Sequence, residues 1–103
     1  MGWKSFTAAV LCGLLVTSGS VQAAGDINAG KTKASSCAGC HGADGKGKSP
    51  NPAIAGMDQS AFAEKMNGYK SGTITHMMMN TLAKKLSDED IANLGAYYAS
   101  LPK

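Results

Sequence analysis

The stretch Cys37-Ala38-Gly39-Cys40-His41 decides how the rest of the chain is interpreted. It has the form C-x-x-C-H, which is the attachment signal for c-type haem. Two thiols three residues apart can each add to one vinyl group of the porphyrin, and the histidine that follows is then carried beneath the iron as an axial ligand. We therefore predict thioether bonds at Cys37 and Cys40 and coordination of the haem iron by His41.

Two other interpretations use the same motif. A redox-active dithiol of the thioredoxin kind would require a β-α-β context, and the sequence contains no alternating strand pattern of useful length. A structural zinc site needs four ligands. Cys37, Cys40, His41 and His76 could supply them, although such sites usually pair C-x-x-C with a second close cluster. Haem c is the prediction, with zinc and the dithiol as alternatives.

Length and charge exclude several classes of protein. The chain has 103 residues, ten basic and seven acidic side chains, and a formal net charge of +3. This length gives at most one ordinary domain, which excludes a multidomain enzyme. The charge is too mild for a nucleic-acid-binding protein. Thirteen glycines and 6% aromatic residues indicate a loop-rich chain with little bulk for a core. A covalently held porphyrin would supply the additional stabilisation that small domains need.

Residues 1–23 have the features of a secretory signal peptide. Lys4 provides the positive start, residues 8–16 form the apolar run, and Ala23 lies at the −1 position of a cleavage site. The run is shorter than the about 20 apolar residues that span a membrane, so we expect cleavage rather than anchoring. The sequence thus predicts an exported, periplasmic domain of residues 24–103 without a membrane span.

The remainder of the chain favours an all-α domain with long connections. Ser60 is the expected N-cap of the second helix, and Ser87 with Asp90 forms a capping box before the last one. Helices are expected over residues 26–36, 60–70, 80–85 and 88–100, with loops over 42–59 and 71–76.

The second axial ligand of the iron is expected from one short segment. The candidates are His76, Met77, Met78 and Met79. Filling a core gap is the usual role of a single methionine, but three consecutive methionines cannot all face one core. A His/Met ligand pair raises the reduction potential and suits electron transfer, whereas a second histidine gives a lower potential.

These residues resemble those of the small periplasmic monohaem class I cytochromes c of bacteria, of the cytochrome c-553 kind. The resemblance covers nearly all of residues 24–103 and includes, besides the C-x-x-C-H motif, residues 52–56, 65–72 and 86–98. Gly30 matches a glycine where the first helix crosses the last. The resemblance implies a class I cytochrome c fold, with three to four main helices and long loops wrapped around one covalently bound haem c.

The resemblance also implies how the proximal histidine is held. In the family a proline carbonyl accepts the Nδ1–H of this histidine, which fixes its tautomer and makes it a better donor to iron. Pro52 matches that proline, and Pro50 is the reserve candidate.

For the distal ligand, the family places a methionine eight residues before the serine that caps the last helix. Counting back from Ser87 gives Met79, with Met78 and then Met77 as reserves. We expect an apolar hollow for the haem lined by Cys40, His41, Ile54 and Met79.

The implied function is that of a periplasmic one-electron carrier. A six-coordinate His/Met haem cycles between Fe(III) and Fe(II) and offers no position for a substrate, so no enzymatic activity is expected. The partners would be other redox proteins, met transiently by a monomer. Six lysines could rim the exposed haem edge, although an ordinary solvated surface explains each equally well: Lys46, Lys48, Lys65, Lys70, Lys84 and Lys85.

Two alternatives remain open on the sequence. The chain could be a tightly bound electron-transfer subunit of a periplasmic dehydrogenase, or a haem sensor with a labile axial ligand. An exposed apolar patch would favour the subunit, and binding of carbon monoxide by the native reduced protein would favour the sensor.

Overall fold

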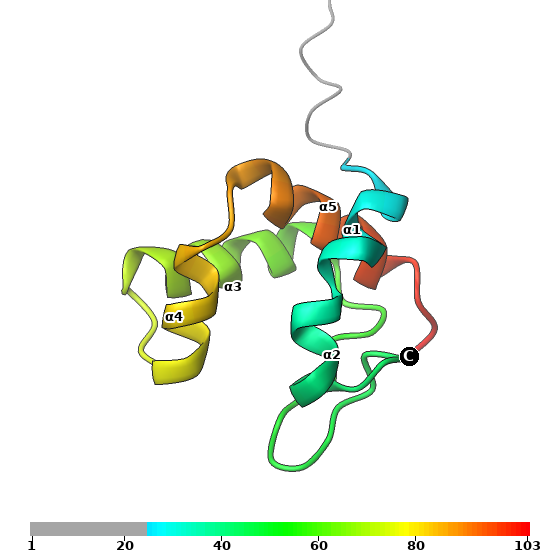
Figure 1. The fold of residues 1–103 in the computed structure, drawn as a ribbon, viewed down its shortest axis with the longest axis horizontal. Coiled ribbons are helices and arrows are strands. Elements are labelled where there is room, and N and C mark those ends of the chain that lie inside the picture. The colour runs from blue at the N-terminus through cyan, green and yellow to red at the C-terminus, as the bar shows by residue number, and fades with distance from the viewer. Residues whose placement is uncertain (1–24) are drawn as a thin grey trace, which may run out of the picture.

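The computed structural model describes residues 25–103, so the expected signal peptide lies outside the described residues. This part of the chain is all-α, as predicted, and has no strand beyond an isolated bridge between Lys48 and Asn51. Its helices, shown in Figure 1, are α1 (Ile27–Lys33), α2 (Ser35–His41), α3 (Gln59–Ser71), α4 (Met77–Lys84) and α5 (Asp88–Ala99). None of these helices is long and apolar enough to cross a membrane.

Helices α1 and α5 cross at Gly30 (Figure 1). A Cβ atom at this buried glycine would lie 2.6 Å from the carbonyl carbon of Asn93, closer still to its oxygen, and 2.8 Å from Cβ of Tyr97. A hydrogen bond also joins the two helices at the start of α1, where the backbone N–H of Asp26 donates to Oδ1 of Asn93 at 2.7 Å. The absence of a side chain at Gly30 is therefore what allows the two backbones to touch, as the family resemblance implied.

The first expected helix continues further than predicted. After α1 the chain turns only at Ala34, whose N–H donates to the carbonyl of Gly30 at 2.8 Å, and it then enters α2. The N–H groups of Cys37 and Ala38 both donate to the Ala34 carbonyl, at 2.8 and 3.0 Å. The C-x-x-C-H motif is consequently helical.

Two predicted helix starts are wrong. Helix α3 is capped by Asp58, whose carboxylate accepts the N–H of Ala61 at 3.1 Å, and not by Ser60. Aspartate and serine are both favoured at the N-cap position, so the residue types alone could not show which of the two caps the helix. Helix α4 starts at Met77 rather than at residue 80, because the side chain of His76 serves as its cap.

The predicted capping box of α5 is present. Ser87 Oγ accepts the N–H of Asp90, and a carboxylate oxygen of Asp90 accepts the N–H of Ser87, both at 3.0 Å. The second of these bonds holds the pKa of Asp90 below its usual value. The Lys33 ammonium lies 3.6 Å from the same carboxylate and joins α1 to α5, although such an exposed pair contributes little stability.

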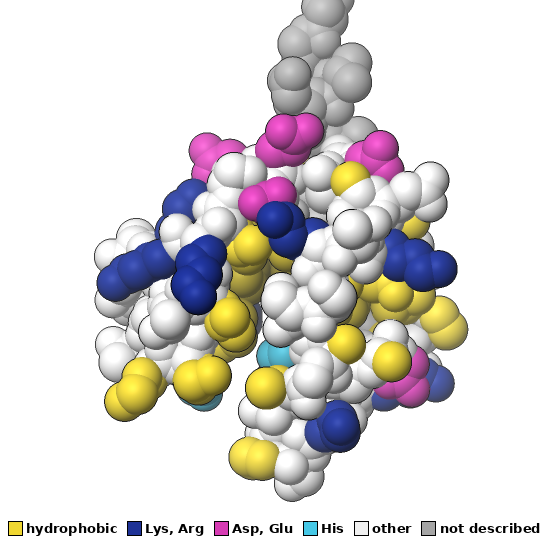
Figure 2. Space-filling view, viewed as in Figure 1, with side chains coloured by type: hydrophobic (Ala, Val, Ile, Leu, Met, Phe, Trp, Pro, Cys, Tyr) yellow, Lys and Arg dark blue, Asp and Glu magenta, His cyan; other side chains and the backbone are white. Residues whose placement is uncertain are grey.

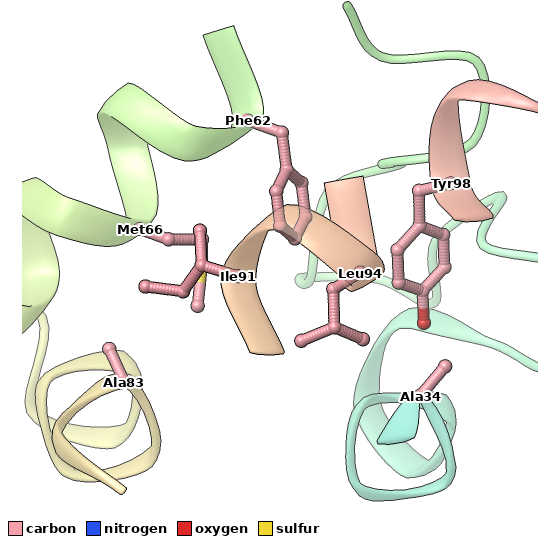
Figure 3. Packing of buried hydrophobic residues seen from close by; sticks show 7 residues of the cluster. All are labelled: Ala34, Phe62, Met66, Ala83, Ile91, Leu94 and Tyr98. Carbon is pink, nitrogen blue, oxygen red and sulfur yellow. The ribbon is translucent and has the colours of Figure 1, made fainter. Parts of the chain in front are cut away.

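The core is small and lies between α5 and the helices beside it (Figure 3). The largest fully buried side chains of the core, Tyr98 and Leu94, both come from helix α5. The ring of Tyr98 stacks on that of Phe62, with the ring centroids 6.0 Å apart. The core cluster consists of Ala34, Phe62, Met66, Ala83, Ile91, Leu94 and Tyr98. Partly buried side chains, among them Cys37, Ile54 and Met79, pack against it, so the core forms one wall of the site described next.

Candidate functional site

Helix α2 presents the motif along one face. Residues three and four apart are neighbours on a helix surface, so Cys40 and His41 both lie next to Cys37. All three line a cavity of about 1010 Å³. In the space-filling view, a hollow with hydrophobic side chains on its walls opens between α2 and α4 (Figure 2).

The ring of His41 is held by a backbone carbonyl. Its Nδ1 lies 2.7 Å from the carbonyl oxygen of Pro52, the residue named from the sequence in preference to Pro50. Because a carbonyl oxygen only accepts, Nδ1–H is the donor, and Nε2 of the neutral ring keeps its lone pair. This is the protonation pattern that a histidine ligand of a metal requires.

The loop after α2 folds back and carries Pro52 to the histidine. The N–H of Gly47 donates to the His41 carbonyl at 2.7 Å, and the side-chain amide of Asn51 donates to the Cys40 carbonyl at 3.0 Å. Gly47 has φ = +93°, and a Cβ there would lie 2.9 Å from the N atom of Ala53. Asn51 was not predicted from the sequence, because its side chain bonds to a backbone carbonyl that no local pattern identifies.

The three methionines differ sharply in their surroundings. Met77 is 80% exposed and does not line the cavity, whereas Met78 lines the cavity but is 57% exposed. Met79 is half-buried, lines the cavity and packs against the core cluster. His76 also lines the cavity, and its Nδ1 accepts the N–H of Met79 at 3.4 Å.

The four residues expected around the hollow all line it: Cys40, His41, Ile54 and Met79. Most of the apolar wall was not predicted from the sequence. Besides Pro52, which was, it comes from Met57, Phe62, Met66, Tyr69, Leu82 and Leu86. The helical spacing of Phe62, Met66 and Tyr69 along α3 marked one apolar face, which could have identified this part of the wall.

Burial changes the pKa of two polar side chains at the core, Cys37 and Tyr98. Burial raises the pKa of the Cys37 thiol, and this outweighs the opposite effect of the nearby Ser36 and Tyr98 hydroxyls. Burial, followed by the neighbouring Cys37, raises the pKa of Tyr98. Both pKa shifts favour the uncharged form of the side chain.

The alternative uses of the motif find no support in this geometry. Within residues 25–103, no three His, Cys, Asp or Glu side chains gather closely enough to hold one metal ion. The four candidate zinc ligands are therefore not brought together. The motif also lies in a purely helical setting in the described chain, not in the β-α-β unit of a thioredoxin-like dithiol.

A comparison with protein-family models identifies the group to which this arrangement belongs. The cytochrome c model matches residues 27–102. The chain belongs to the cytochrome c family. As a cytochrome c it carries covalently attached haem c with iron.

The relatives of this cytochrome c are bacterial. It is 42% identical over 95 residues to cytochrome c4 of Pseudomonas aeruginosa, covering 88% of this chain and 47% of that protein. It is 38% identical over 81 residues to cytochrome c-554(548) of Halomonas halodenitrificans, covering 75% and 98%. The chain thus spans about half the length of that cytochrome c4 and nearly all of the shorter protein.

A solved structure shows the same fold. The thiosulfate dehydrogenase TsdBA of Marichromatium purpuratum is similar with a TM-score of 0.70 and 31% identity, covering 74% of this chain and 19% of that one.

The cavity of this cytochrome c fits the group that the family carries. Two cysteines for the thioethers lie on one helix face, beside a histidine whose Nδ1–H is already engaged. The walls are largely apolar, as a porphyrin ring requires, and the volume lies at the upper end of the about 300–1,000 Å³ of typical ligand pockets. The residues present therefore fit a haem c.

The charges around the cavity are mixed. Of the six lysines considered from the sequence, Lys65 and Lys85 line it, and Lys33 lines it as well. Lys70 instead lies 3.9 Å from the carboxylate of Asp88. Acidic side chains gather along the edge far from the open end of the hollow, and lysines flank the hollow itself (Figure 2).

Proposed function

We propose that this cytochrome c is a one-electron carrier of the periplasm in which His41 and Met79 hold the haem iron. Bound haem c supplies the chemistry, a single-electron exchange between Fe(III) and Fe(II). The proposal rests on one observation: His41 and Met79, far apart in the sequence, line the same apolar cavity. Two protein ligands leave no iron position for a substrate, so we assign no enzymatic activity to this chain.

The surroundings of the methionines support Met79 as the distal ligand. A ligand must keep its thioether in one place, and Met79 alone among the three both lines the cavity and packs against the core. Met78 is the reserve because it lines the cavity from the more exposed side, and Met77 is the least suited.

The other residues of the site set the conditions for electron exchange. Pro52 fixes the ring of His41 through the Nδ1–H bond, which keeps the proximal ligand unchanged between the two iron states. The apolar walls exclude water and lower the local dielectric. This environment disfavours the extra positive charge of Fe(III), so together with a thioether ligand it raises the reduction potential.

Met79→Ala is expected to remove the weak near-infrared absorption that arises from sulfur bound to Fe(III). The wild-type protein should show this band and should not bind carbon monoxide when reduced at neutral pH. The variant should lack the band and bind carbon monoxide, because its iron has an open position. Absorption spectra of the oxidised protein and of the reduced protein under carbon monoxide measure both effects.

Met77→Ala is the matched control, since it removes an identical side chain two residues away that does not line the cavity. It should keep the band and exclude carbon monoxide. The opposite pattern between the two variants would refute Met79 as the ligand. Carbon monoxide binding by the native wild-type protein would favour the sensor alternative.

We further propose that residues 1–23 direct export and are removed, which leaves a periplasmic domain beginning at Ala24. We expect this domain to be a monomer. Its redox partners would bind transiently at the mouth of the cavity, where the haem edge is accessible. The lysines beside the cavity would give local and modest steering, because the net charge of the chain is small.

A second candidate function is that of an electron-transfer subunit of a dehydrogenase. The structural relative named thiosulfate dehydrogenase suggests it, and exposed apolar side chains at Ile74, Met77 and Met78 favour it. Size-exclusion chromatography of a periplasmic extract at low salt distinguishes a free carrier from an enzyme subunit. A carrier elutes as a free chain, whereas a subunit co-elutes with an enzyme that it reoxidises.

A further inference from the structure

The side chain of Asn80 joins three segments beside Met79. Its Oδ1 accepts the backbone N–H of His76 at 2.7 Å. Its Nδ2 donates to the carbonyls of Tyr69 and Ile74, both at 2.8 Å. The last turn of α3, the connecting loop and the first turn of α4 are therefore all held by one amide.

These bonds interlock with the cap of α4. The ring of His76 accepts the N–H of Met79, and the amide of Asn80 accepts the N–H of His76 in return. This is a reciprocal arrangement like a capping box, with Asn80 in the role that a glutamate usually has. The backbone of Met79 thus lies between two residues that fix one another.

The first turn of helix α4 depends on these contacts for its position, because the buried residue of α4, Ala83, lies in the second half of the helix. The helix has only eight residues, and isolated helices of that length are not stable in water. Met77 and Met78, its first two residues, are exposed and add little packing. Most of the restraint on the turn that carries Met79 must therefore come from the capping bonds and from Met79 itself.

We propose that Asn80 is the positioning residue that keeps the Met79 thioether at the haem iron. The amide, rather than a carboxylate or an alkyl group, is required because the site needs one acceptor and two donors at once. Without it, the turn would open more often and expose the iron to outside ligands. The inference rests on the proposed role of Met79 as the distal ligand.

The test uses Asn80→Ala and Asn80→Asp in the haem-containing protein. The alanine variant loses all three side-chain bonds. The aspartate variant has nearly the same shape and keeps the acceptor, but it places a carboxylate oxygen against two carbonyl oxygens. Asn67→Ala is the matched control, since Asn67 is an exposed asparagine on α3 that makes none of these bonds.

Three properties are measured on the purified haem-containing fraction, so that a lower yield does not affect them. They are the near-infrared sulfur band, the dissociation constant of imidazole for the oxidised protein, and the thermal unfolding midpoint. Both Asn80 variants should show a weakened band and bind imidazole at least about tenfold more tightly than wild type, since net loss of one or two hydrogen bonds shifts an equilibrium by that much or more. The control should match wild type.

A purely structural role for Asn80 would lower the unfolding midpoint and leave the folded protein's band and imidazole affinity as in the Asn67→Ala control. That result in either Asn80 variant would overturn the proposal. If wild type itself lacks the band, Met79 is not the ligand and the proposed function fails. If wild type shows the band and either variant keeps it unchanged, only the role of Asn80 fails.

Discussion

Simultaneous Cys37→Ala and Cys40→Ala substitution is expected to abolish covalent haem attachment and, with it, the folded state. Without thioethers the porphyrin is not retained, and the cavity of about 1010 Å³ would be left without its contents. Each apolar wall side chain that the haem would otherwise shield from water is worth about 1.5–3 kcal/mol, so four of them would cost about 6–12 kcal/mol. This is comparable with the about 5–15 kcal/mol of total stability of a typical domain.

Far-UV circular dichroism and intact mass of the purified double variant measure this outcome. The expected product is colourless, without bound haem, and has lost most of its helical signal. Cys40→Ala alone is the control, because Cys37 can still form one thioether and keep the haem in place. A double variant that is colourless yet as helical as wild type would show that the polypeptide folds without the porphyrin.

Gly30→Ala is expected to lower the free energy of unfolding by about 3 kcal/mol, at the upper end of the usual cost of overpacking. The added methyl group would overlap backbone atoms of Asn93 and approach Cβ of Tyr97 at 2.8 Å. Backbone atoms cannot rotate away as a flexible side chain can, so α1 and α5 must separate. Chemical denaturation of the haem-containing protein, followed by circular dichroism, measures the change.

Gly39→Ala is the matched control for this prediction. Gly39 is also helical, but a Cβ there would meet nothing within 4 Å. Its substitution should leave stability unchanged or raise it by up to about 1 kcal/mol, because alanine favours the helix. Equal stabilities for the two variants would contradict the view that the α1–α5 contact depends on the missing side chain at Gly30.

Features set by local spacing were predictable from the sequence. The motif at residues 37–41 predicted a haem attachment site, and the spacing of Ser87 and Asp90 predicted the cap of α5, which the structure confirms. Hydrogen-bond partners inside such patterns lie within a few residues of one another, so the chain itself determines them. The helix crossing at Gly30, in contrast, was predicted from the resemblance to a known family and not from local spacing.

Features that depend on the folded chain were not predictable. Asn51 and Asn80 bond to carbonyls of Cys40 and Tyr69, each eleven residues away. Asparagine is common in loops for many reasons, so neither position stood out. The start of α4 was placed too late for a related reason, since histidine is not among the preferred N-cap residues.

The proposed function depends on one haem bonded to the chain through Cys37 and Cys40. The intact mass of the secreted protein tests this bond, measured after unfolding in acid so that any non-covalently bound haem is released. We expect the mass of residues 24–103 plus one haem. The mass of the polypeptide alone, from a host that attaches haem to other c-type cytochromes, would contradict it.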